Sequence, residues 1–176
     1  MRLTGAWKAE EGYNQIIGKY RNFEELADAD LTYLSEVFEP LGLTSRAENL
    51  IEMSQEIIEK FGGELPANFE KLIEINGVGR YTANAILCFS YKKKAPIADR
   101  NVKRIFERYF NYESDKPPYA DNELWKLADI LLPSDNYVEY NLSLLDFSAK
   151  VCTYTKPSCN NCPLFDSCIY IMKLEE

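Results

Sequence analysis

The stretch INGVGRYTA, residues 75–83, decides the fold. Apolar residues recur at helical spacing before it, over 68–75, and after it, over 80–91. Gly77 and Gly79 flank one small apolar residue and therefore predict a tight turn between two helices. Backbone N–H groups at the start of the second helix favour an anion, and glycines let a phosphate come close. Glycine also ends helices for purely structural reasons, so the turn alone leaves both explanations open.

Helical patterns cover most of the chain, whereas strand signals are weak throughout. Of its 176 residues 46% are hydrophobic, enough to bury one substantial core or two small lobes. No apolar run is long enough to span a bilayer. We expect an all-α protein with a cysteine-rich C-terminal cap. The predicted helices cover residues 7–20, 22–28, 30–39, 45–61, 68–75, 80–91, 99–110, 120–132 and 136–150.

Charge is distributed unevenly along the sequence. The formal net charge is −8, and residues 1–76 account for all of it, with seven Lys or Arg against fifteen Asp or Glu. Residues 92–108 instead hold seven basic side chains against two acidic ones. This basic strip is a candidate anion-binding face on an acidic protein. A solvated helix face would have the same composition, so the charge count leaves that alternative open.

Asp99 stands at the expected start of the helix over 99–110, within the run PIADRNVKR at residues 96–104. As a helix N-cap it needs no chemistry. Held near a nucleic acid by basic neighbours, the same carboxylate could stabilise a cationic transition state or orient a water. The two roles are compatible.

Four cysteines, Cys152, Cys159, Cys162 and Cys168, follow a C-x6-C-x2-C-x5-C pattern. Thiolates on short loops can surround one iron–sulfur cluster at low entropic cost. Zinc is the main alternative, although all-cysteine zinc sites usually present two C-x2-C pairs and this chain has one. Two disulfides are a weaker alternative, because the first twenty residues are too polar for a secretion signal.

Taken together, residues 20–172 resemble the helix–hairpin–helix DNA glycosylases of the endonuclease III superfamily. The turn, the downstream Asp99 and the cysteine spacing carry the resemblance, with LGLTSRAENL at 41–50 and LDFSA at 145–149. The set is similar to the branch that includes MutY-type adenine glycosylases and archaeal-type thymine mismatch glycosylases. One departure is Asn76, which stands where a proline is common.

The resemblance implies an all-α helix–hairpin–helix glycosylase fold, with the hairpin at 68–91. It implies a helical-barrel lobe over 20–112 and a cluster lobe made of 1–19 and 113–176, with an incomplete N-terminal part. The four cysteines would hold a structural [4Fe–4S] cluster.

The resemblance also implies roles for single residues. Strand-cleaving members carry a lysine two positions after the second glycine, where this chain has Tyr81, and a phenol cannot form an imine. We therefore expect a monofunctional glycosylase that hydrolyses the N-glycosidic bond of an extruded base, with Asp99 stabilising the oxocarbenium-like sugar or helping water attack. The expected DNA contacts are Gly77, Val78, Gly79, Arg80, Thr82, Asn101, Lys103, Arg46 and the wedge residue Leu43.

The expected partner is double-stranded DNA with a mismatched or damaged base, in the nucleoid of a prokaryotic cell, with no membrane. The end of the chain at Glu176 favours T or U opposite G over A opposite G or 8-oxoguanine, because enzymes that verify 8-oxoguanine usually carry a further domain.

The catalytic glutamate of this branch falls upstream of Met1, and Glu10 and Glu11 lie beyond the matching position. General-acid help is worth about a hundredfold to ten-thousandfold in rate. The alternative is therefore a catalytically weakened protein that binds DNA structure without cleavage. A shortened N-terminus would also favour self-association. A zinc-stabilised helical interaction module is the third alternative.

Overall fold

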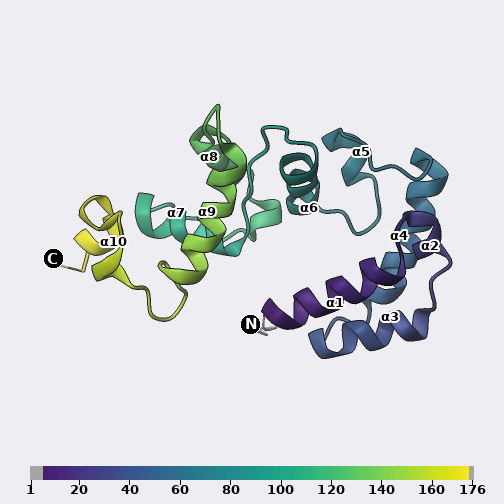
Figure 1. The fold of residues 1–176 in the computed structure, drawn as a ribbon. Coiled ribbons are helices and arrows are strands. Elements are labelled where there is room, and N and C mark those ends of the chain that lie inside the picture. Colours follow the sequence, from purple (N-terminus) through teal and green to yellow (C-terminus); the bar gives the residue numbers. More distant parts are fainter. Residues whose placement is uncertain (1–5, 175–176) are drawn as a thin grey trace. The chain divides into compact units, whose positions relative to one another are not determined.

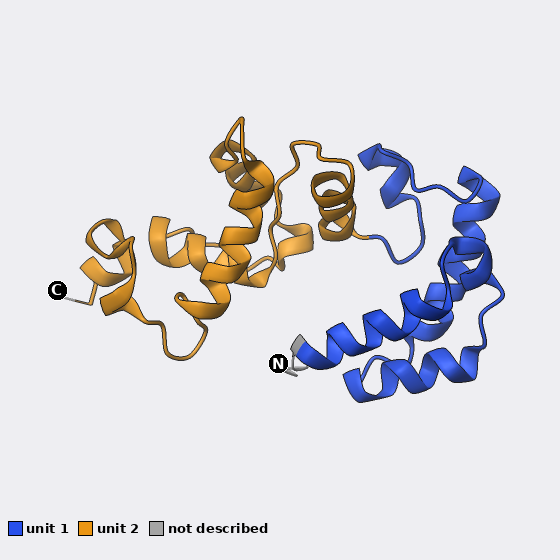
Figure 2. Cartoon of the chain, viewed as in Figure 1, with its two compact units in different colours: residues 1–78 blue, residues 79–176 orange. Residues whose placement is uncertain are grey.

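The computed structural model describes residues 6–174, which form helices and loops and contain no strand (Figure 1). An all-α fold is therefore confirmed. The chain forms two compact units, residues 1–78 and 79–176 (Figure 2), and each is described by itself. The predicted lobe that joins 1–19 with 113–176 combines segments of different units and stays a prediction. No helix within the described residues is long and apolar enough to cross a membrane.

In unit 1, the long helix α4 packs against α2 and α3, while α1 packs against α3. The core side chains Leu34, Ala47, Ile57 and Leu72 are fully buried. Side-chain caps start the short helices: Asn22 accepts from the N–H of Glu25 at 2.8 Å. The elements are α1 (Ala6–Lys19), α2 (Phe23–Ala27), α3 (Leu31–Phe38), the 3-10 turn η1 (Glu39–Leu41), α4 (Arg46–Phe61) and α5 (Phe69–Ile73).

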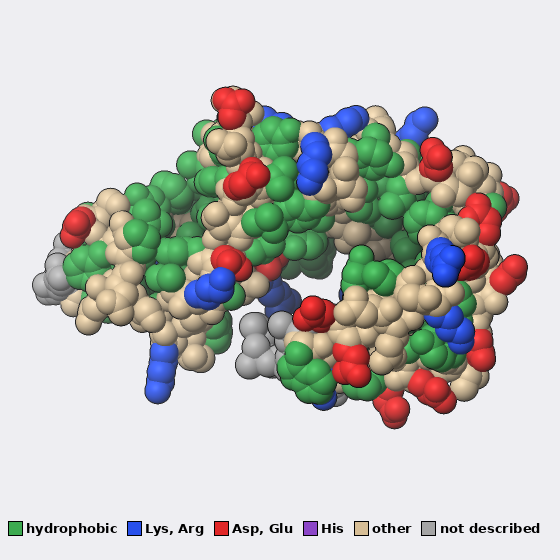
Figure 3. Space-filling view, viewed as in Figure 1, with side chains coloured by type: hydrophobic (Ala, Val, Ile, Leu, Met, Phe, Trp, Pro, Cys, Tyr) green, Lys and Arg blue, Asp and Glu red, His purple; other side chains and the backbone are tan. Residues whose placement is uncertain are grey.

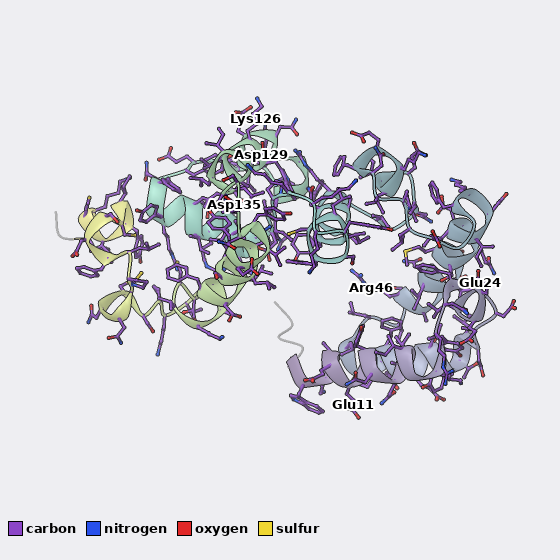
Figure 4. All side chains as sticks on the ribbon, turned by 45° about the horizontal axis from the view of Figure 1, so that its top comes forward. Glu11, Glu24, Arg46, Lys126, Asp129 and Asp135 are labelled. Carbon is purple, nitrogen blue, oxygen red and sulfur yellow. The ribbon has the colours of Figure 1, made fainter. Side chains whose placement is uncertain are left out.

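Unit 1 also carries the acidic surface that the sequence predicts. In the face shown in Figure 3, carboxylate side chains gather over the helices of this unit. Figure 4 shows Glu11 on α1, Glu24 on α2 and Arg46 at the start of α4.

In unit 2, α7 packs against α9 and α10, and α9 also packs against η2. The elements are α6 (Arg80–Ala85), the π-helical turn η2 (Ile86–Ser90), α7 (Arg100–Phe110), η3 (Pro118–Ala120), α8 (Asn122–Leu131), α9 (Tyr137–Lys150), η4 (Cys159–Asn161), η5 (Phe165–Ser167) and α10 (Ile169–Met172). Its core contains Ala98, Val102, Ile105, Phe106, Leu124, Trp125 and Ala128. Figure 4 marks Lys126 and Asp129 on α8, with Asp135 in the loop before α9.

All nine predicted helices are present, with ends that shift by one or two residues. The predicted helix over 80–91 changes its hydrogen bonding part-way, because Tyr91 N–H donates to the carbonyl of Ile86, five residues before it, at 3.2 Å. Such π-turns are rare and often occur near functional sites. This turn comes shortly before the segment that leads to Asp99.

Candidate active site and cysteine cavity

The turn after α5 has the conformation that its glycines predict. Gly77 has φ +83°, in the region where a side chain is strained. The N–H of Val78 donates to the carbonyl of Ile75 at 3.0 Å, and Gly79 is extended just before α6 begins. Gly77, Gly79 and Thr82 are exposed, whereas Val78 is buried. Because α5 and α6 belong to different units, their role in DNA contact stays a prediction.

Asn76 has a use that a proline could not fulfil. Its backbone N–H donates to Glu56 Oε2 on α4 at 2.8 Å. Glu56 Oε1 accepts from Lys60 Nζ at 2.6 Å. The Lys60 hydrogen bond, followed by the Asn76 N–H, lowers the pKa of Glu56. Proline lacks the N–H, so the departure from the family pattern is matched by a hydrogen bond that holds the turn to α4.

Asp99 is the N-cap of α7. Its Oδ1 accepts from the N–H groups of Asn101 and Val102, both at 2.8 Å. Its Oδ2 accepts from Asn101 Nδ2 at 2.8 Å. A carboxylate offers about four acceptor positions, so three bonds fix its orientation and leave Oδ2 able to accept one more. The structure therefore confirms the predicted cap and leaves the half-buried carboxylate able to meet a ligand.

The orientation of Asn101 depends in turn on Arg104. Arg104 Nη1 donates to Asn101 Oδ1 at 2.9 Å. Its other nitrogens donate to the carbonyls of Cys152, from Nε at 3.1 Å, and of Ser148, from Nη2 at 3.0 Å. Arg104 as a whole is 9% exposed. A continuous hydrogen-bonded path thus joins the Asp99 carboxylate to the backbone of Cys152.

Tyr81, two residues after Gly79 and in the first turn of α6, is 38% exposed. Partial burial, and then the negative charge of Asp99, raises the pKa of the Tyr81 phenol. The phenol is therefore close enough to sense Asp99 and stays protonated at neutral pH. The two residues that the sequence predicts as catalytic lie in the same unit.

The basic strip over 92–108 is only partly a surface. Lys103 is 8% exposed, and its Nζ donates to the carbonyls of Ser114 and Lys116, both at 2.6 Å. Asp121 Oδ2 lies 3.6 Å from the same ammonium. The predicted phosphate contact of Lys103 does not fit this position, because its charge holds a loop inside unit 2. The exposed basic side chains of the strip are Lys92, Lys93, Lys94 and Arg100.

Three other predicted DNA contacts lie on separate elements. The Arg80 guanidinium stacks 4.5 Å from the ring centroid of buried Trp125, and its Nη1 donates to Asn122 Oδ1 at 3.0 Å. Burial lowers the pKa of Arg80. In unit 1, Leu43 is 38% exposed and Arg46 is exposed. Asp99 belongs to unit 2, so the DNA contacts of Leu43 and Arg46 stay predictions.

The four cysteines line one cavity in unit 2. No group of three His, Cys, Asp or Glu within residues 6–174 is placed to hold a single metal ion. Burial, followed by the neighbouring cysteines, raises the pKa of Cys159. Leu164 N–H points at Cys162 Sγ, 3.4 Å away. The other lining residues are Ile105, Arg108, Tyr109, Phe147, Val151, Pro157, Leu164, Phe165, Tyr170 and Ile171.

Arg108 shapes the loop that begins at the first of these cysteines. Its Nη1 donates to the carbonyl of Thr153 at 2.7 Å and lies 3.4 Å from Cys152 Sγ. Its Nη2 donates to the carbonyl of Tyr154 at 3.0 Å. The guanidinium therefore reaches both the Cys152 sulfur and the backbone of the loop that follows it. Arg108 thus lines the cysteine cavity. Its position in the basic strip had predicted a surface charge instead.

Residues 6–129 match the family described as HhH-GPD superfamily base excision DNA repair protein. The chain belongs to this superfamily. The HhH-GPD chain is 33% identical over 174 residues to a thymine/uracil-DNA glycosylase of Methanothermobacter thermautotrophicus, covering 98% of this chain and 79% of that protein. It is 37% identical to a thymine-DNA glycosylase of Aeropyrum pernix, covering 97% of this chain and 78% of that protein.

Solved structures agree with this assignment. The HhH-GPD chain superposes on a thermostable thymine-DNA glycosylase with a TM-score of 0.90 and 34% identity, covering 98% of this chain and 80% of that one. A DNA-bound endonuclease III has the same fold, with a TM-score of 0.86 and 23% identity, covering 98% of this chain and 80% of that one. The predicted membership of the endonuclease III superfamily is therefore confirmed.

Sequence reasoning missed several residues around the HhH-GPD site. The sequence placed Arg104 and Arg108 in the basic strip, which predicts only a charged surface. Asn141 on α9 belongs to no motif that predicts a role for it. A weak signal existed for α7, where Val102, Ile105 and Phe106 predict one buried face. Nothing in the sequence indicates that two basic side chains would be buried with them. The catalytic glutamate that the resemblance places upstream of Met1 is not among the described residues.

Proposed function

We propose that this protein is a monofunctional DNA glycosylase that removes a mismatched base, T or U opposite G. The observation that carries the proposal is 33–37% identity to thymine/uracil-DNA and thymine-DNA glycosylases over almost the whole chain. Asp99 and Tyr81 support it, because they supply a fixed carboxylate and a neutral phenol in one unit. Removal of A opposite G or 8-oxoguanine is the second candidate, because adenine DNA glycosylases are also similar, at 31–34% identity.

Asp99 is the proposed catalytic carboxylate. Cleavage of an N-glycosidic bond builds positive charge on the sugar, and a preorganised carboxylate stabilises that charge without reorienting. The free acceptor position of Oδ2 is suited to the sugar or to the attacking water. Water then forms the new bond to the anomeric carbon, and the base departs with the electron pair of the broken bond and a proton.

Tyr81 supports hydrolysis without strand cleavage. An amine is needed to form a Schiff base with the opened sugar, and a phenol has none. Burial and the negative charge of Asp99 raise the pKa of Tyr81, which keeps the phenol an O–H donor. The proposed product is an intact strand with an abasic site.

The proposed cofactor is a [4Fe–4S] cluster bound by Cys152, Cys159, Cys162 and Cys168. Four thiols around one apolar cavity fit its donor set, and the Leu164 N–H and Arg108 supply hydrogen bonds to sulfur. When bound, the cluster would cross-link the loop after α9 with the turns η4 and η5 and the start of α10, in a cavity that α7 lines with Ile105, Arg108 and Tyr109. Brown protein with broad visible absorbance and about four irons per chain is expected. Colourless protein that binds zinc would contradict the cluster.

The proposed DNA contacts are the exposed hairpin residues, Arg46 and the wedge Leu43. Backbone N–H groups of a glycine turn bind phosphate without reading sequence, which suits a search for rare mismatches. The acidic surface of unit 1 would weaken binding elsewhere, so affinity should fall steeply with salt. A nucleoid location follows from this substrate and stays a prediction, as does self-association.

A single-turnover assay tests the function. Duplexes with T·G, U·G, A·G and A·8-oxoG mismatches are incubated with excess protein, and alkali then cleaves any abasic site. Strand breaks at T·G and U·G only after alkali are expected, and Asp99→Asn should abolish them while duplex binding persists. Mismatch binding without base loss in the unaltered protein would support the DNA-structure-binding alternative instead. Breaks before alkali would refute the assignment of Tyr81.

A further inference from the structure

Asn141, in the middle of α9, is a buried polar residue that the proposed mechanism does not use. It is 1% exposed and lies in the core of unit 2. A carboxamide away from water is costly unless its donors and acceptor are paired. The hydrogen-bond partners of Asn141 therefore indicate its structural role.

The carboxamide of Asn141 pairs with the segment that leads into Asp99. Its Nδ2 donates to the carbonyl of Ala95 at 2.9 Å, and its Oδ1 accepts from the N–H of Ile97 at 3.3 Å. Nδ2 also lies 3.3 Å from Cys88 Sγ on η2. A single side chain thus forms hydrogen bonds with the carbonyl before Pro96 and with the N–H after it, as the backbone of a neighbouring strand would.

The segment needs such a partner because it is buried but belongs to no helix. Ala95, Ile97 and Ala98 are each at most 4% exposed. Buried backbone groups are almost always paired, and Pro96 contributes no N–H of its own. One turn before Asn141 on α9, Tyr137 donates to the carbonyl of Lys92 at 2.5 Å. Side chains four residues apart lie on the same helix face, so this face of α9 holds the segment over 92–97.

Asp99 follows this segment by two residues, still in extended conformation. From the other side, its carboxylate is fixed by the first turn of α7 and by Asn101. We infer that Asn141 is a positioning residue, which sets the place of the Asp99 carboxylate through the backbone of Ala95 and Ile97. The inference rests on the proposed function for its kinetic consequence but not for its structural one.

The first test is Asn141→Leu, which keeps the volume and removes the hydrogen bonds. Amide exchange at Asn101 and Val102, whose N–H groups bond to Asp99 Oδ1, should become at least about tenfold faster. A misplacement of about 1 Å costs on the order of a hundredfold in rate, so excision should slow about 10- to 100-fold with mismatch affinity within about threefold. The matched control is Ala128→Gly in the same core, which destabilises a helix without removing a hydrogen bond from the segment.

The second test is Asn141→Asp across pH 5.5 to 8.5. A protonated carboxyl donates to Ala95 and accepts from Ile97 as the carboxamide does, whereas the ionised form has no donor. Burial favours the protonated form at low pH. The excision rate of the variant relative to the unaltered protein should therefore fall as pH rises. Cys88 is the titratable contact of this position, Tyr137 stands one turn away, and the segment itself begins with the exposed Lys92, Lys93 and Lys94.

Each measurement can overturn the positioning role of Asn141. Unchanged amide exchange in Asn141→Leu would overturn the inference, as would a pH-independent ratio for Asn141→Asp. Loss of protection in Ala128→Gly equal to that in Asn141→Leu would also overturn it. If the unaltered protein excises no base, the proposed function fails, and the exchange measurement still judges the role of Asn141. If Asn141→Leu does not fold, the change of the Asn141→Asp ratio between pH 5.5 and 8.5 decides.

Discussion

Replacing Arg104 by lysine should slow base excision without abolishing DNA binding. The guanidinium contacts three acceptors at once: Asn101 Oδ1, the carbonyl of Ser148 and the carbonyl of Cys152. Lysine keeps the charge, but a single ammonium on a flexible stem cannot reproduce this planar fork. Asn101 would lose the partner that orients its amide, and Asp99 Oδ2 would lose its fixed donor.

The magnitude follows from these contacts. A hydrogen bond to a charged group contributes about 1.5–3 kcal/mol, and lysine can keep one or two of the three. With one or two bonds lost, the free energy of unfolding should therefore fall by about 1.5–6 kcal/mol. A rotated Asn101 displaces the reacting carboxylate, and a shift of about 1 Å costs on the order of a hundredfold in rate. We expect single-turnover excision to slow about 10- to 100-fold.

The assay combines three measurements on Arg104→Lys. Urea unfolding gives stability, a titration with mismatched duplex gives affinity, and single-turnover base loss gives the rate. Arg21→Lys, an equal chemical change at an exposed position of unit 1, is the matched control and should leave all three unchanged. An excision rate within twofold of the unaltered protein, despite reduced stability, would refute the idea that Arg104 orients Asp99 through Asn101.

Two further predictions concern structural ion pairs. Lys103→Met leaves the Asp121 carboxylate, 1% exposed, without its ammonium, and should cost about 3–5 kcal/mol in urea unfolding. Adding Asp121→Asn should restore part of that loss, and full additivity would contradict a coupled pair. Glu56, whose pKa is lowered, stabilises unit 1 fully above the ordinary glutamate pKa, and this contribution is lost as pH falls through its own pKa. Glu56→Gln should therefore be less stable than the unaltered protein at pH 7, and the difference should shrink as pH falls through the lowered pKa of Glu56. A pH-independent difference would contradict the Asn76 and Lys60 contacts.

Much of the fold could be predicted from local patterns. Helix caps such as Asn22, Asp99 and Asp121 act within one turn, so the sequence is sufficient to locate where their helices begin. The same holds for Gly77, whose positive φ is a property of the residue type. The spacing of the four cysteines predicted that they would gather, and they line one cavity. These features depend on neighbours a few residues away.

The direction of a charged side chain depends instead on distant backbone. The turn over 75–83, the helices and the position of Asp99 followed from sequence by itself, because caps, glycines and apolar periodicity are local. Only the tertiary structure decided that Lys103 and Arg104 lie inside unit 2 while Arg100 stays exposed. It also decided that Asn141, 42 positions after Asp99, pairs with the segment before it. Backbone carbonyls that loops leave unpaired form hydrogen bonds with buried side-chain donors. Which carbonyls need such a partner is decided only when α7 and α9 pack together.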